Sequence, residues 1–267
     1  MRVVFAAARS SPGVTTGMLA CASVWPGEVL LVEASEDGGA LAARFGLPVE
    51  PGLTTLAAAS RHGNNGDRQA ASLGLHVQRL PGTDRIEVLV GPASPESAQA
   101  LLRAAAGRLA GLLDGAEIDV LIDAGRLPAA PLAAPLIEAA DRLVLVVRPR
   151  VEELTALAHR LANLASVGPA LEVLLIGDRP YGPREVADTL GVPVVGVLAH
   201  DPYAADALAA VGSARRLGRS QLLRSAASIV DGLTRAQPTS STGGADTSSV
   251  NGKPVGVPRR RLLSRRS

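Results

Sequence analysis

The chain has 267 residues, of which 47% are hydrophobic and 19% charged, and a formal net charge of +2. This composition is typical of a folded protein with a sizeable core and not of a disordered one. Aromatic residues make up only 2% of the sequence, which argues against stacking of single-stranded nucleic acid as the main activity. The single cysteine, Cys21, excludes an intrachain disulfide and a multi-cysteine metal site, and we expect it in the core.

Short apolar runs alternate with stretches rich in Ala and Leu. The apolar runs predict strands at 2–7, 29–33, 77–80, 86–90, 120–123, 143–147, 173–176 and 194–198. The stretches between them predict helices at 15–23, 39–45, 54–60, 95–113, 152–165, 184–190, 204–210 and 221–235. Most strands lack polar alternation, as expected for parallel strands covered on both faces. The pattern therefore predicts one α/β domain over 1–236, with a doubly wound, mostly parallel sheet and helices on both faces.

The first strand leads directly into a loop of small residues and a Thr-Thr pair that opens a helix. The sequence of this segment is RVVFAAARSSPGVTTGMLACA. Strand, small-residue loop and helix in this order are typical of a phosphate-binding loop, in which backbone N–H groups and a helix N-terminus form a cradle of positive potential. A strict loop of this kind also has a lysine for the phosphates and a Ser or Thr for Mg²⁺. Taken alone, the segment also fits a simple β–α connection in which Thr15 caps the helix.

The loop resembles that of the ParA/MinD family of P-loop ATPases, which reads KGGxGKT[ST]. The family pattern aligns with Arg9-Ser10-Ser11-Pro12-Gly13-Val14-Thr15-Thr16. Three positions match the pattern: Gly13, Thr15 and Thr16. The departures make this Walker A loop degenerate, because Arg9 replaces the signature lysine, Val14 replaces the loop lysine, and serines replace the glycine pair. The resemblance implies that the nucleotide would lie against Arg9, Ser10, Ser11, Gly13, Val14, Thr15 and Thr16, with Thr15 also binding Mg²⁺.

The resemblance continues in collinear order along the rest of the domain. The family's acidic DxDxxG segment follows its second strand, and here Glu33 and Asp37 occupy that place as candidate catalytic carboxylates. Asp123, at the end of VLID, is similar to the family's Mg²⁺-sensing aspartate and is a candidate for both catalysis and metal binding; a strand-end cap is the alternative. Asp178 and Asp201 stand where the family contacts the nucleotide base.

The family's activity implies ATP and Mg²⁺ as cofactors, but the charge needed for hydrolysis is missing. The only lysine of the chain is Lys253, far from the loop in sequence, and the rigid guanidinium of Arg9 is not an equivalent replacement. Three alternatives follow: ATP hydrolysis, nucleotide binding without hydrolysis, and no use of a nucleotide. ATP with Mg²⁺ and no cofactor at all are equally compatible with the sequence.

The resemblance implies a role in spatial positioning or assembly. We expect a pseudo-ATPase scaffold that forms a homodimer or docks a protein partner in cell division, chromosome partitioning, or secretion and pilus machinery, similar to MinD-like members of the CpaE/TadZ type. The alternative is an active ATP-dependent dimerisation switch that binds membrane or DNA. Turnover of ATP and ATP-dependent dimerisation distinguish the two.

The C-terminal segment has a different composition. The last fifteen residues carry six cations and no acid, whereas the rest of the chain has 21 basic and 25 acidic residues. Residues 237–267 predict a disordered basic tail, which attracts anionic membrane surfaces or nucleic acid, or serves only solubility. Tail-mediated nucleic-acid binding is thus a third functional hypothesis. No stretch approaches the ~20 apolar residues of a membrane span, so we expect a cytoplasmic protein, at most peripheral to the membrane.

Overall fold

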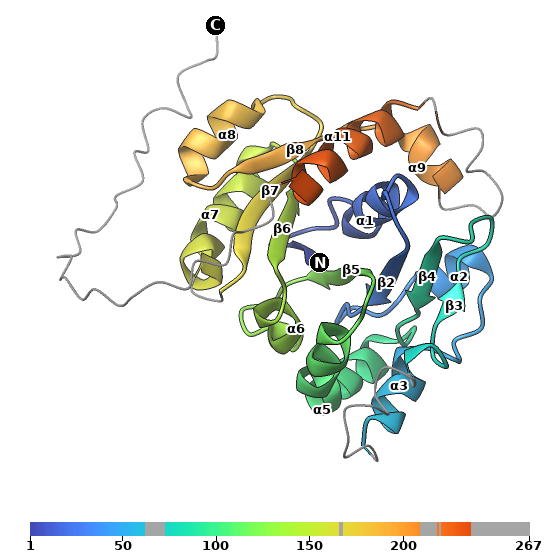
Figure 1. The fold of residues 1–267 in the computed structure, drawn as a ribbon. Helices are drawn as coiled ribbons and strands as arrows, with labels where there is room; N and C mark the ends of the chain where they lie inside the picture. Colours follow the sequence, from blue (N-terminus) through green and yellow to red (C-terminus); the bar gives the residue numbers. More distant parts are fainter. Residues whose placement is uncertain (62–72, 166–167, 209–217, 219, 236–267) are drawn as a thin grey trace, which may run out of the picture. The chain divides into compact units, whose positions relative to one another are not determined.

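The computed structural model describes residues 1–61, 73–165, 168–208, 218 and 220–235. Within these ranges eight strands form one sheet in the order β3-β4-β2-β5-β1-β6-β7-β8 (Figure 1). The strands are β1 (Arg2–Ala7), β2 (Val29–Glu33), β3 (Gln78–Arg79), β4 (Ile86–Leu89), β5 (Asp119–Arg126), β6 (Arg142–Val147), β7 (Ala170–Ile176) and β8 (Val194–Leu198). All neighbours pair in parallel except β3 and β4, which are antiparallel.

Helices cover both faces of the sheet, which confirms the predicted doubly wound fold (Figure 1). The residue alternation of the strands assigns the two faces: in β1, Val4 belongs to one core cluster, and Val3 and Phe5 belong to the other. The first cluster is covered by α3 (Leu53–Ala59), α5 (Pro95–Asp114), α6 (Ala134–Glu138), α7 (Val151–Ala165) and α8 (Pro183–Leu190). The second is covered by α1 (Val14–Ser23), α2 (Leu41–Phe45), α9 (Pro202–Leu208) and α11 (Gln221–Arg235).

Helix α5 begins at a capped position. In α5, Ser94 accepts a hydrogen bond from the Ser97 N–H at 3.2 Å, and Pro95 occupies the first helical position.

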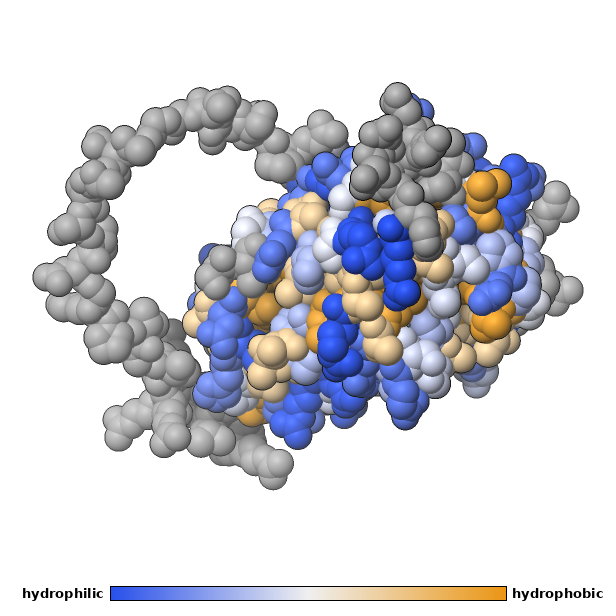
Figure 2. Space-filling view, turned by 90° about the horizontal axis from the view of Figure 1, so that it is seen from below, coloured by the Kyte–Doolittle hydropathy of each residue, from blue (hydrophilic) through white to orange (hydrophobic). Residues whose placement is uncertain are grey.

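Cys21 is fully buried in α1, as expected, and burial raises the pKa of its thiol to about 12. None of the described helices is long and apolar enough to span a lipid bilayer. On the face drawn in Figure 2, hydrophilic residues are interspersed with small hydrophobic patches.

Most predicted elements agree with the structure, with a few differences. The predicted helix at 39–45 begins later, at Leu41, and β5 continues past the predicted end at Asp123 to Arg126. Helix α6 was not predicted, because its short stretch contains proline and shows no helical periodicity. The tail predicted at 237–267 lies outside the described residues. The domain limit at 236 therefore stays a prediction.

The strand order reverses direction at β1. From β1 the chain passes through α1 to β2, which lies on one side of β1 in the strand order, whereas β6, β7 and β8 lie on the other side of β1. In open α/β sheets, ligands bind outside the carboxyl ends of the strands at such a reversal of strand order. The loop that follows β1 begins at this edge.

Candidate functional site

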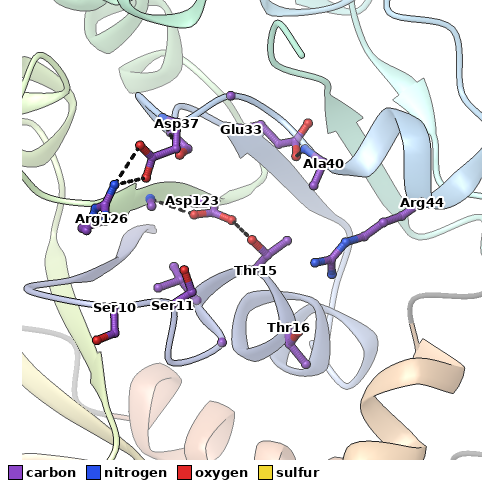
Figure 3. Close-up of a pocket in the computed structure, with 15 residues that line it drawn as sticks. Ser10, Ser11, Thr15, Thr16, Glu33, Asp37, Ala40, Arg44, Asp123 and Arg126 are labelled. Atoms are coloured by element: carbon purple, nitrogen blue, oxygen red, sulfur yellow. Dashed lines mark hydrogen bonds and ion pairs between the residues drawn. The ribbon is translucent and has the colours of Figure 1, made fainter. Parts of the chain in front are cut away.

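A cavity of about 340 Å³ opens at the carboxyl ends of β1, β2 and β5 (Figure 3). Its walls are the loop after β1, the first turn of α1, the ends of β2 and β5, and the side chain of Arg44 from α2. The volume lies near the lower end of the range of about 300–1,000 Å³ typical of small-ligand pockets. Among the predicted site residues, those that line it are Ser10, Ser11, Gly13, Val14, Thr15, Thr16, Glu33, Asp37 and Asp123.

The loop after β1 curls around the first turn of α1. Ser10 and Gly13 have positive φ angles of 62° and 110°, and Gly13 is the N-cap residue of the helix. No side chain caps this end, so the first N–H groups of α1 are not satisfied by a capping residue. Unsatisfied N–H groups and the helix dipole attract an anion here. The alternative in which Thr15 caps the helix is wrong, because Thr15 lies inside the first turn and its side chain points elsewhere.

The Thr15 hydroxyl donates a hydrogen bond of 2.5 Å to Oδ2 of Asp123. The other oxygen, Oδ1, accepts from the Gly125 N–H at 2.8 Å. The alternative of a strand-end cap is wrong, because β5 continues through both residues to Arg126. Asp123 is 3% exposed. Burial raises the pKa of its carboxyl group, and the hydrogen bonds from Thr15 and Gly125 and the positive charge of Arg44 oppose that rise.

This pair fits a divalent cation that is shared with a phosphate. A hydroxyl and a carboxylate are oxygen ligands of the kind Mg²⁺ prefers, and Mg²⁺ commonly takes one or two protein oxygens plus phosphates and water. In the described ranges there is no group of three or more His, Cys, Asp or Glu side chains that would hold a metal alone. Thr15 and Asp123 would therefore supply the protein ligands and the bound anion the others.

Glu33 lines the cavity, but its carboxylate is occupied by backbone N–H groups. Oε1 accepts from Ala40 at 2.7 Å and Leu41 at 2.8 Å, and Oε2 accepts from Gly91 at 3.1 Å. Burial raises the pKa of Glu33 and the charge of Asp123 adds to the rise, while the three hydrogen bonds oppose it. The geometry shows Glu33 fastening the start of α2 to the end of β2, and its catalytic role stays a prediction.

Two arginines that sequence reasoning missed line the cavity, Arg44 and Arg126. Arg126, at the end of β5, forms an ion pair with Asp37 at 3.1 Å, and both side chains are about half exposed. Arg44 extends from α2 toward the first turn of α1 (Figure 3). Neither arginine belongs to the loop pattern. The only signal in the sequence was that each follows a predicted strand, Arg44 after the strand at 29–33 and Arg126 after the strand at 120–123.

Three predicted nucleotide-contacting residues do not line this cavity: Arg9, Asp178 and Asp201. Arg9 and Asp178 are exposed. The Asp201 carboxylate accepts a hydrogen bond from the Ala204 N–H at 3.0 Å, at the start of α9. The contacts predicted for these three residues, with the nucleotide and its base, stay predictions.

Comparison with solved structures places this architecture among known folds. A ParA family ATPase from Chlorobium tepidum TLS aligns with a TM-score of 0.70 and 18% identity over 87% of this chain and 97% of that chain. The septum site-determining protein MinD complexed with Mg-ADP, from Pyrococcus horikoshii OT3, aligns with a TM-score of 0.66 and 17% identity over 87% and 95%. A chain of the MinC:MinD cell division protein complex from Aquifex aeolicus aligns with a TM-score of 0.60 and 13% identity over 95% of this chain and 98% of that chain.

No protein-family model matches the sequence, and no curated protein matches it either. At these identities the likeness is one of fold, and it extends over nearly the whole length of the similar structures. The chain has the fold of the ParA and MinD ATPases.

Proposed function

We propose that the protein is a MinD/ParA-like positioning or assembly protein that binds a Mg²⁺-nucleotide and hydrolyses it poorly or not at all. The observation that carries the proposal is the Thr15–Asp123 hydrogen bond, which lies at the uncapped N-terminus of α1 beside an open cavity. A simple β–α connection has no need for a buried carboxylate on that hydroxyl. A site for a metal and phosphate needs both groups.

The chain's own groups divide the work of binding. The loop and the first N–H groups of α1 would hold phosphate oxygens, and Thr15 and Asp123 would hold the cation. When bound, Mg²⁺ supplies positive charge that offsets the negative charge of the phosphates. The similar MinD of Pyrococcus horikoshii was solved with Mg-ADP, which supports this class of ligand.

Val14 is the reason to expect weak hydrolysis. It is buried, and it stands where a phosphate-binding loop has the lysine that stabilises charge on the transferring phosphoryl group. An apolar side chain supplies no such stabilisation. Nucleotide would then act as a ligand that stabilises one form of the protein, and not as a fuel.

A scaffold of this kind needs a partner. The Aquifex aeolicus MinD was solved in a complex with MinC, which supports a protein partner for this fold. We propose a homodimer or a partner complex in division, chromosome partitioning, or secretion and pilus machinery. Contacts of the tail with anionic membrane or nucleic acid remain a separate hypothesis.

The test is equilibrium binding of a fluorescent ATP analogue with Mg²⁺ to the wild type and to Thr15→Ala. We expect saturable binding in the micromolar range that Thr15→Ala weakens by at least about tenfold, since it removes one proposed cation ligand. Thr54→Ala is the matched control, because Thr54 is an exposed helical threonine on α3, away from the cavity. Circular dichroism checks that each variant is folded.

Two outcomes contradict the proposal in different ways. If the wild type binds no nucleotide up to millimolar concentrations, the site has no nucleotide-binding function. Multiple turnovers of ATP to ADP, lost in Thr15→Ala, would instead support the active dimerisation switch.

A further inference from the structure

The loop has Val14 where a lysine would place a positive charge near the phosphates. We propose that Arg44, from helix α2, supplies that charge instead, an inference that rests on the proposed function. Arg44 lines the same cavity as Thr15 and Asp123 although it lies outside the loop in sequence. In Figure 3 its side chain reaches from α2 toward the first turn of α1. The chain thus has an arginine on a neighbouring helix in place of a lysine in the loop.

The charges that line the cavity leave this role to Arg44. Arg126 is engaged by Asp37, with contacts of 3.1 and 3.2 Å to the two carboxylate oxygens. In the described part of the chain, no hydrogen bond or ion pair engages the Arg44 guanidinium. Arg148 does not line the cavity; it donates a hydrogen bond to the Ser11 carbonyl at 3.3 Å and lies 3.6 Å from Glu153.

Arg44 and the Thr15–Asp123 pair face the same cavity from different elements. No ion pair within 4.0 Å joins the described side chains of Arg44 and Asp123, so the two groups stand apart across the cavity. An anion that enters between them would therefore meet both the cation and the proposed metal ligands.

The fold holds α2 in the position that this role requires. Glu33 accepts hydrogen bonds from the N–H groups of Ala40 and Leu41, at the first turn of the helix. Arg44 follows Leu41 by three residues, so it lies about one turn along a helix that is fastened to the sheet. Two further residues of α2, Leu41 and Phe45, are buried in the core and hold the helix on the sheet.

A guanidinium at this position favours negatively charged ligands. It offers a planar fork of donors that matches phosphate oxygens. Its contribution grows with the negative charge of the ligand and vanishes for an uncharged nucleoside. We therefore expect Arg44 to contribute to the affinity for ATP and for free tripolyphosphate, and not to that for adenosine.

The experiment measures the binding of Mg-ATP, tripolyphosphate and adenosine to the wild type, Arg44→Ala, Arg44→Lys and Arg103→Ala. We expect Arg44→Ala to lower the affinity for Mg-ATP and for tripolyphosphate about 10- to 100-fold, because a charge-assisted contact is lost. Arg44→Lys should recover part of this loss. Arg103→Ala, which removes an exposed arginine of α5 outside the cavity, should leave the affinity unchanged. Thermal unfolding of each variant shows whether α2 remains packed.

The failure of this inference is distinct from failure of the proposed function. If the wild type binds Mg-ATP in a Thr15-dependent way and Arg44→Ala binds as tightly as Arg103→Ala, Arg44 has no such role and the proposed function stands. If the wild type binds neither ligand, both are overturned. A folded Arg44→Ala that loses affinity for adenosine as strongly as for ATP would also overturn the role, since charge would not be the cause.

Discussion

Glu33 and Asp123 are register partners on neighbouring strands, so two carboxylates lie buried side by side below the cavity. Each is 3% exposed, and burial raises the pKa of both. The protein keeps them there by satisfying their oxygens with N–H and O–H donors. The two residues nevertheless serve different ends, since Glu33 fastens backbone and Asp123 faces the Thr15 hydroxyl.

We expect Glu33→Ala to reduce the free energy of unfolding by about 2–4 kcal/mol, because three backbone N–H groups lose their acceptor. The measurement is urea denaturation followed by circular dichroism. Glu117→Ala, at an exposed position outside the cavity, is the control and should change the stability by less than about 0.5 kcal/mol. Equal effects of the two variants would refute the fastening role of Glu33.

The raised pKa of Asp123 predicts a pH dependence of stability. In the folded state its carboxyl group keeps a proton at pH values where the unfolded chain, with the ordinary value of 3.8, has released it. The folded state therefore binds more protons, and stability falls as pH rises from the unfolded toward the folded pKa. Asp123→Asn should be more stable than the wild type above the folded pKa, with the difference shrinking as pH falls toward 3.8.

Urea denaturation of both proteins at about pH 4.5 and pH 7.5 measures this difference. The asparagine can still accept from Gly125 and donate to Thr15, so the packing is preserved. A stability difference that is the same at both pH values would show that the raised pKa is not the cause.

Part of the site was predictable from single residues. A small-residue loop between a strand and Thr-Thr has few common uses, and an aspartate that ends an apolar strand lies at the edge where ligands bind. Arg44 was not predictable, because its position depends on how α2 packs on the sheet. Asp178 and Asp201 show the reverse case: a collinear resemblance named them, and the described cavity does not include them.

At the scale of elements, α5 carries two glycines that pack against nothing. A Cβ added at Gly107 or Gly111 would meet no atom within 4 Å, and both residues are exposed. Replacing each by alanine should add about 0.5–1 kcal/mol to the free energy of unfolding, since glycine loses more conformational freedom on folding. Chemical denaturation measures the gain.

Gly196 in β8 is the contrasting variant. A Cβ there would lie 2.6 Å from Cγ1 of Ile229 in α11, so Gly196→Ala should destabilise the protein by about 1–3 kcal/mol. A neutral Gly196→Ala would mean that α11 shifts without cost.

The elements themselves were largely predictable, because their signals are local. Apolar runs identified most strands of the sheet, and the strand predicted at 77–80 includes the short β3. The helix predicted at 95–113 corresponds to α5. The sequence could not show that β3 pairs antiparallel with β4. Pairing partners depend on contacts between distant segments.

For the molecule as a whole, α11 completes the core. Its buried residues contact β8 and α1 and are Leu222, Leu223, Ala226, Ile229, Val230 and Leu233. Burial of one Leu, Ile or Val side chain contributes about 1.5–3 kcal/mol, and the net stability of a domain is about 5–15 kcal/mol. A chain that ends at Ser220 should therefore lose cooperative thermal unfolding.

A chain that ends at Ala236 is the matched control and should unfold cooperatively, with the melting temperature of the full chain. This comparison also tests the predicted domain limit. A shortened chain ending at Ser220 that still melts cooperatively would show that α11 is dispensable. Loss of the transition in the control would place the limit further along the chain.

The pairing of α11 with α1 has a consequence for biosynthesis. Helix α1 leaves the ribosome early, and the helix that covers it is the last one described, ending at Arg235. At about 5–20 residues per second, the interval between the two is roughly 10–40 s. During that time the apolar surface of α1 has no final cover. Cellular factors that shield nascent chains therefore have a defined window and a defined surface to protect.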